Sequence, residues 1–78
     1  MIMRYKYRTG IPEMFKRYGI KPHWHGWYQC DRDDFQHFYD QIKYGGEVTK
    51  VYVEIGGKAY AWEQNKGWKQ LKEISYED

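Results

Sequence analysis

The clearest pattern of apolar positions lies between residues 31 and 63, where it predicts one helix followed directly by a β-hairpin. Asp31 is placed to cap the start of the helix, and the pair Gly45-Gly46 is placed to end it. Between them, apolar side chains recur at the spacing of a single helical face. These side chains are Phe35, Phe38, Tyr39 and Ile42.

The hairpin prediction depends on the pair Gly56-Gly57, which forms a tight turn between two alternating segments. The turn fixes the paired positions, which are Ile55 with Lys58, Val53 with Tyr60, Val51 with Trp62, Tyr52 with Ala61, and Lys50 with Glu63. Apolar and polar residues then separate onto two faces, and a shift by one residue would mix them. We expect the helix stripe to pack on the face formed by Val51, Val53, Tyr60 and Trp62.

Shorter patterns predict the elements that precede this unit. Residues 2–8 alternate as a half-buried strand, with Met3, Tyr5 and Tyr7 on one face and Arg4, Lys6 and Arg8 on the other. Pro12 suits the first position of a short helix that Gly19 ends. Residues 23–30 predict a strand, and Gly26 within it indicates a bulge or a close backbone contact.

The end of the chain allows two interpretations. Residues 64–67 predict a turn with Gly67 in the left-handed region, and residues 68–72 then return as a third hairpin strand. The alternative is a helical turn, because Trp68, Leu71 and Ile74 are three residues apart. We favour the strand, and we expect Ser75–Asp78 to fray.

Together these segments give the order β-α-β-α-β-β-β and predict the α+β class. We expect one domain over residues 1–78, with a mainly antiparallel sheet and two helices packed on one of its faces. The strand order in the sheet stays open. Aromatic residues make up 21% of the chain, and they are the expected source of its stability because Cys30 is the single cysteine.

Charge and hydropathy narrow the class of protein. A lone thiol fits a reducing compartment, and the first eight residues lack the apolar core of a signal peptide. No apolar run approaches the length of a membrane span. We therefore expect a cytoplasmic protein. The net charge is only +2, but residues 1–22 contain six basic side chains (Arg4, Lys6, Arg8, Lys16, Arg17 and Lys21) against Glu13 alone.

Candidate metal ligands and catalytic groups are few. His23, His25, Cys30 and His37 could together form a tetrahedral zinc site, since the H-x-H spacing places two imidazoles on one side of a strand. Cys30 with His37 could act as a nucleophile and base, but no orienting group or oxyanion loop accompanies them.

Structural roles explain these residues more simply. The histidines then frame buried tryptophans, and Cys30 is a small apolar residue. The acidic group Asp31, Asp33 and Asp34 serves the helix start rather than a cation. We expect no metal, no cofactor and no enzymatic activity.

The remaining signal is the surplus of aromatic residues, which are four Trp, nine Tyr and three Phe. More of them are present than a core of this size needs, and exposed Tyr and Trp are typical interface anchors. The leading hypothesis is a non-enzymatic protein-binding module, an inhibitor or an assembly adaptor, with self-association as one form of it. The alternative is a nucleic-acid-binding domain, because basic and aromatic residues interleave. The candidate partner-binding residues are Trp24, Trp27, Tyr52, Tyr5, Arg4, Lys6, Arg8 and Lys50.

In style, though not in any particular residues, a short, Tyr- and Lys-rich chain without motifs resembles the accessory proteins of phages and mobile elements. That resemblance assigns no site to this chain.

Overall fold

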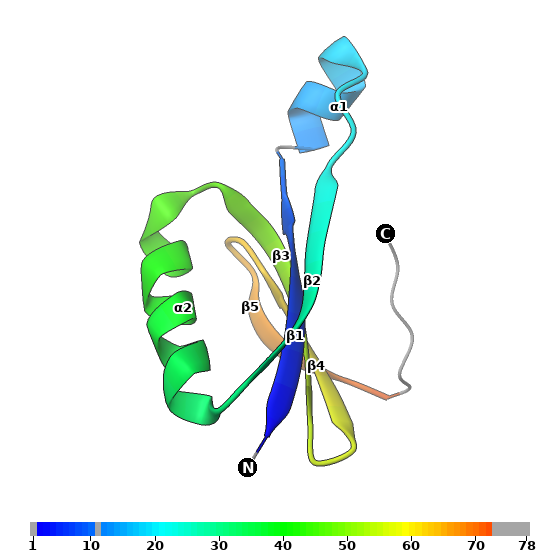
Figure 1. Cartoon of the computed structure of the whole chain (residues 1–78). Helices are drawn as coiled ribbons and strands as arrows, with labels where there is room; N and C mark the ends of the chain where they lie inside the picture. The colour runs from blue at the N-terminus through cyan, green and yellow to red at the C-terminus, as the bar shows by residue number, and fades with distance from the viewer. Residues whose placement is uncertain (1, 11, 73–78) are drawn as a thin grey trace.

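The computed structural model describes residues 2–10 and 12–72 and contains five strands and two helices (Figure 1). They follow one another in the order that the sequence predicts. The elements are β1 (Met3–Thr9), α1 (Pro12–Tyr18), β2 (His23–Cys30), α2 (Arg32–Gly45), β3 (Val48–Ile55), β4 (Lys58–Glu63) and β5 (Gly67–Leu71). All strand pairs are antiparallel, and the order in the single sheet is β2-β1-β3-β4-β5. The α+β class, the element order and the strand interpretation of residues 68–72 are confirmed.

Helix α2 begins and ends at the residues that the sequence indicates. Asp31 has an extended backbone, and its carboxylate accepts a hydrogen bond of 2.9 Å from the backbone N–H of Asp34, which satisfies one of the unpaired donors at the helix start. Gly46 has φ of 77°, the left-handed conformation that glycine adopts without a steric penalty, and it closes the C-terminal end.

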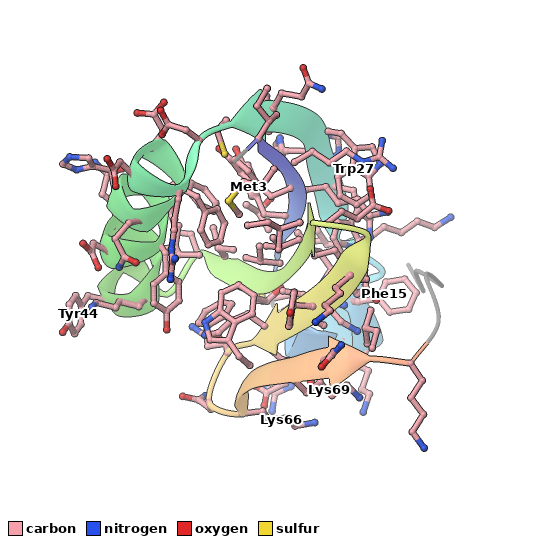
Figure 2. All side chains as sticks on the ribbon, turned by 90° about the horizontal axis from the view of Figure 1, so that it is seen from below. Met3, Phe15, Trp27, Tyr44, Lys66 and Lys69 are labelled. Carbon is pink, nitrogen blue, oxygen red and sulfur yellow. The ribbon has the colours of Figure 1, made fainter. Side chains whose placement is uncertain are left out.

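The core lies between α2 and one face of the sheet (Figure 1). Ile42 is buried there with β-sheet residues, and Phe35, Phe38 and Tyr39 pack against the same cluster. The buried members of the cluster are Met3, Ile42, Val48, Val51, Val53 and Trp62. Figure 2 shows Met3 between the helix and the sheet. The predicted packing of the helix stripe on the hairpin is therefore confirmed for Val51, Val53 and Trp62, which belong to this cluster.

The β3–β4 hairpin has the predicted register at every pair from Ile55–Lys58 to Lys50–Glu63. Within the last of these pairs, Glu63 forms its ion pair with Lys66, whose Nζ lies 3.5 Å from the carboxylate. Nζ of Lys50 instead lies 5.2 Å from the ring centroid of Tyr52, its neighbour on the same face. Gly67 has φ of 80°, as the turn prediction requires.

The position of α1 differs from the prediction that both helices pack on one face. Helix α1 lies beyond the ends of β1 and β2, away from the layer that α2 forms (Figure 1). Residues 13–20 are all exposed. A helix of this length has too few apolar positions on one side to cover a sheet, and the core-facing half of the sheet is already filled by α2. The predicted fraying of Ser75–Asp78 lies outside the described residues.

Candidate functional site

The face of the sheet turned away from α2 has no helix over it, and we call it the open face (Figure 1). Cross-strand partners share a face, so the register assigns its residues directly. From β2 to β5, glycines aside, they are Trp24, Trp27, Gln29, Arg4, Lys6, Arg8, Lys50, Tyr52, Glu54, Ala59, Ala61, Glu63, Lys69 and Leu71. Seven of the eight sequence-predicted binding residues are thus brought together on one surface.

A β-bulge in β2 determines which side its tryptophans occupy. Tyr5 pairs with Tyr28 and Lys6 pairs with Gly26, so Trp27 is an extra residue inserted between two consecutive pairs of the β1–β2 register. Two residues three apart in a regular strand point to opposite faces, but the inserted residue brings Trp27 to the same face as Trp24. In Figure 2, Trp27 lies on the side of the sheet opposite α2.

Gly26 makes this bulge possible. Its φ is 129°, and a Cβ atom added there would lie 2.8 Å from Cβ of Lys6, closer than real Cβ atoms approach. The predicted bulge at Gly26 is therefore confirmed. It brings Trp24 and Trp27 to the same face, which the alternation of residues alone does not predict.

Basic and aromatic side chains on the open face cover one another. The Arg4 guanidinium carbon lies 4.4 Å from the centroid of the Trp27 ring, and Nζ of Lys6 lies 4.7 Å from that of Trp24. The Trp24 and Tyr52 rings stack with centroids 5.3 Å apart and planes within 7°. Tyr52 is only 3% exposed, so its ring supports the surface and has little area for a partner.

Hydrogen bonds and ion pairs hold two of the arginines in place. Arg4 forms an ion pair with Glu54. Nε of Arg8 donates a 3.0 Å hydrogen bond to Oγ1 of Thr49, the one buried polar residue among those described. The guanidinium groups are thus oriented before any ligand arrives, which lowers the entropic cost of binding an anion.

Small side chains on β4 leave a shallow groove between β3 and β5. Ala61 contributes to its floor, and Tyr52 and Leu71 flank it within a volume of about 570 Å³. Four lysines and one carboxylate line the groove, namely Lys50, Lys66, Lys69, Lys72 and Glu63. Figure 2 shows Lys66 and Lys69 along the turn and strand of this edge. The groove extends the positive charge of β1 across the sheet.

Charge is strongly segregated between the two sides of the molecule. The open face and its groove contain seven basic residues against Glu54 and Glu63; the basic ones are Arg4, Lys6, Arg8, Lys50, Lys66, Lys69 and Lys72. Helix α2 with its cap has the opposite balance, with Asp31, Asp33, Asp34 and Asp40 against Arg32 and Lys43. A net charge of +2 therefore hides a strongly cationic surface.

The candidate residues predicted from the sequence do not include one part of this surface, the groove lysines Lys66, Lys69 and Lys72. Extending the predicted register by one strand supplies the signal, since Tyr52 pairs with Ala61 and Ala61 pairs with Lys69.

Tyr5 is the one candidate that lies on the other face. Its ring centroid is 4.6 Å from that of Phe38 and 5.4 Å from that of Phe35, within the aromatic cluster under α2. Burial is the main cause that raises the pKa of the Tyr5 hydroxyl. Tyr5 therefore contributes to the core, and alternation along β1 separates it from Arg4 and Lys6.

The histidines and the cysteine do not converge. The His23 and His25 rings lie 4.5 Å apart, as the H-x-H spacing predicts, and Nε2 of His25 lies 3.1 Å from Oγ1 of Thr9. Within residues 2–10 and 12–72, the structure contains no group of three His, Cys, Asp or Glu side chains that could hold a metal. Burial, followed by the nearby Asp34 and Asp31 carboxylates, raises the pKa of the Cys30 thiol, which disfavours the reactive thiolate.

Comparison with protein-family models, with curated proteins and with solved structures found no match for this chain. Neither helix in the described part of the chain has the length and apolar character needed to cross a membrane.

Proposed function

We propose that this protein is a non-enzymatic nucleic-acid-binding module and that the open face is its binding surface. The observation that supports the proposal most strongly is the charge of that face, where seven basic residues gather against two carboxylates. Lysine and arginine side chains that neutralise phosphates release condensed counterions, which is the main source of sequence-independent affinity.

The shape and composition of the surface agree with a polyanionic chain as ligand. Positive charge runs along β1 and continues into the groove beside β4, so several successive phosphates could be contacted at once. Half-buried Trp24 and Trp27 hold cations over their rings and keep them spread across the face. An isolated anionic small molecule would need only one of these positions.

Neutralising three basic residues of this surface should weaken the binding of nucleic acid and make that binding less dependent on salt. We expect a variant with Arg8→Gln, Lys50→Gln and Lys69→Gln to bind a mixed-sequence oligonucleotide about tenfold or more weakly at about 50 mM salt. Its plot of log affinity against log salt should be shallower by about 2, since each lost contact to a single strand contributes about 0.7. Fluorescence anisotropy between about 50 and 200 mM salt measures both quantities.

The matched control removes the same charge from elsewhere on the molecule. Arg32→Gln, Lys43→Gln and Lys58→Gln together lower the net charge equally, but these residues lie on α2 or on the core side of the hairpin. We expect the control to bind like the wild type. Equal losses in both variants, or wild-type binding that does not change with salt, would contradict the proposal.

A protein partner is the second candidate, and it is favoured by a different surface. A hollow of about 740 Å³ lies between α2 and the β1–β2 edge, with the rings of Tyr7, His25 and Phe38 in its lining. Tyr44, in the last turn of α2, is 85% exposed. Tyr44 belongs to the same helix as Phe38 and Ile42, which line the hollow. An exposed aromatic side chain is typical of an interface anchor, and an inhibitor or assembly adaptor, including one encoded by a phage or mobile element, would use it in this way.

The Tyr44→Ala substitution tests that second candidate. A partner that binds at this surface should be captured from the native host by the wild-type chain and lost, by about tenfold or more, with the variant. The exposed tyrosine Tyr18 on α1 provides the control, because Tyr18→Ala should leave the capture unchanged. A partner retained by Tyr44→Ala would place the interface elsewhere.

A further inference from the structure

Helix α1 combines exposed aromatic rings with positive charge. Phe15 is 45% exposed and Tyr18 is 66% exposed, and Lys16 and Arg17 lie between them in the sequence. The helix has one acidic residue, Glu13, in its first turn. A seven-residue helix with two large exposed rings gains little stability from packing on its own chain. These side chains are therefore suited to contact a ligand.

The arm formed by α1 is anchored where the basic strand ends. Arg8 pairs with Trp24 in the last part of the β1–β2 ladder, and the chain enters the arm shortly after Arg8 and leaves it shortly before Trp24. A Cβ atom at Gly10 would lie 3.2 Å from Cα of Pro22, so the two ends of the arm meet closely. The row of positive charge on β1 therefore leads to the base of α1.

The arm and the open face are turned to the same side. In Figure 2, Phe15 lies on the side of the sheet that also holds Trp27, whereas Tyr44 on α2 lies on the opposite side. Lys16 and Arg17 follow Phe15 in the same short helix, so the arm adds two positive charges beyond the ends of β1 and β2. A polymer that follows the row of Arg4, Lys6 and Arg8 would reach the aromatic rings of α1 next.

The aromatic rings of the two regions differ in how much of their surface they offer. On the open face, the Trp24 ring stacks on Tyr52, and Nζ of Lys6 lies within 5.5 Å of the centroids of Trp24, Trp27 and Tyr52. On α1, the rings of Phe15 and Tyr18 are largely exposed. A nucleobase that stacks on an aromatic side chain needs such an exposed ring face.

Resting on the function proposed above, we propose that α1 is a base-stacking arm and that the ligand is a single-stranded nucleic acid. Phosphates contact the basic residues of the open face, and unpaired bases stack on Phe15 and Tyr18. A duplex buries the faces of its bases in its own stack, so it can use the open face but not the arm. The open face then provides most of the affinity for nucleic acid, and α1 provides the preference for a single strand.

The experiment measures how tightly the wild type and the Phe15→Ala and Tyr18→Ala variants bind each of three polyanions. The probes are a mixed-sequence single strand, the duplex of the same sequence, and inorganic polyphosphate, which has phosphates but no bases. Each variant should bind the single strand about 5- to 150-fold more weakly, which corresponds to about 1–3 kcal/mol per stacked base. Binding of the duplex and of polyphosphate should stay within about twofold, and the salt dependence should not change, because stacking releases no counterions.

Controls separate stacking from any effect on folding. Tyr28→Ala removes an equally exposed ring, at 45%, from the face of the sheet on which Tyr5 lies, and it should leave all three affinities unchanged. Phe15→Trp restores an aromatic ring, so it should recover single-strand affinity, and its fluorescence should be quenched when the strand binds. A loss caused by misfolding would not be rescued by this larger residue.

Three results would overturn the inference, and they are distinguishable from failure of the proposed function. Single-strand affinity that is unchanged in Phe15→Ala and Tyr18→Ala overturns the stacking role, while salt-dependent binding through Arg8, Lys50 and Lys69 would still stand. An equal loss of polyphosphate binding would show that α1 acts without bases. Self-association that both α1 variants abolish, with nucleic-acid binding intact, would make the arm a protein interface.

Discussion

Replacing Trp62 with alanine should remove a large part of the protein's free energy of unfolding and lower its urea midpoint strongly. Trp62 is 6% exposed and lies in the central cluster between α2 and the sheet. Truncating a buried Trp costs about 3–5 kcal/mol, from lost apolar burial and from the cavity that remains. A domain of this size has a free energy of unfolding of only about 5–10 kcal/mol.

The position of Trp62 explains why so little can compensate for its loss. Its ring meets that of Tyr39 edge to face at 6.0 Å, so it joins the helix to β4 directly. Val51, its cross-strand partner, is fully buried and has no rotamer that could fill an indole-sized space. The measurement is urea denaturation followed by circular dichroism, with Tyr44→Ala as the exposed aromatic control. A midpoint for Trp62→Ala equal to that of the control would mean that this packing is wrong.

The second large effect is expected for Gly26→Ala. The substitution forces an L-residue into φ of 129° and places its Cβ atom 2.8 Å from Cβ of Lys6. Backbone strain of about 1–3 kcal/mol and an overpacking cost of similar size give a total of about 2–6 kcal/mol. The structure could relieve the strain only by separating β1 from β2 or by losing the bulge.

Gly57→Ala is the matched control, because it measures the cost of a positive φ without the cost of a close contact. Gly57 also has positive φ, at 77°, but no atom lies within 4 Å of the Cβ that alanine would add. We expect a loss of about 1–2 kcal/mol there, measured by the same denaturation. A cost at Gly26 no larger than at Gly57 would show that the close approach to Lys6 is not fixed. A folded Gly26→Ala chain should also have altered tryptophan fluorescence, because Trp27 would leave the open face.

Local rules account for the parts of the fold that the sequence predicts well. The limits of α2 follow from Asp31 and Gly46, and the hairpin register follows from the turn at Gly56-Gly57, since each depends on residues only a few positions apart. The strand order depends on contacts across the whole chain. The insertion of β1 between β2 and β3 therefore had no local signal.

The candidate site was predictable in its composition but not in its arrangement. Alternation correctly predicts that Arg4, Lys6 and Arg8 lie on one side of β1. The same rule places Tyr5 on the other side, although the sequence analysis names it among the candidate partner-binding residues. The positions of Trp24 and Trp27 depend on a bulge, and a bulge changes faces by an amount that periodicity alone does not define. The projection of α1 could not be foreseen, because it depends on α2 having already filled the core face.

The position of β1 in the sheet has a consequence for the time course of folding. The C-terminal meander β3–β4–β5 pairs neighbouring segments, so it can form early at a small loop-closure cost. By contrast, Met3 pairs with Ile55, and the rest of β1 likewise needs β3. Contacts this distant in sequence slow folding. During synthesis, β1 can pair early with β2, but its other edge must wait for β3, and that edge stays exposed to chaperones until then.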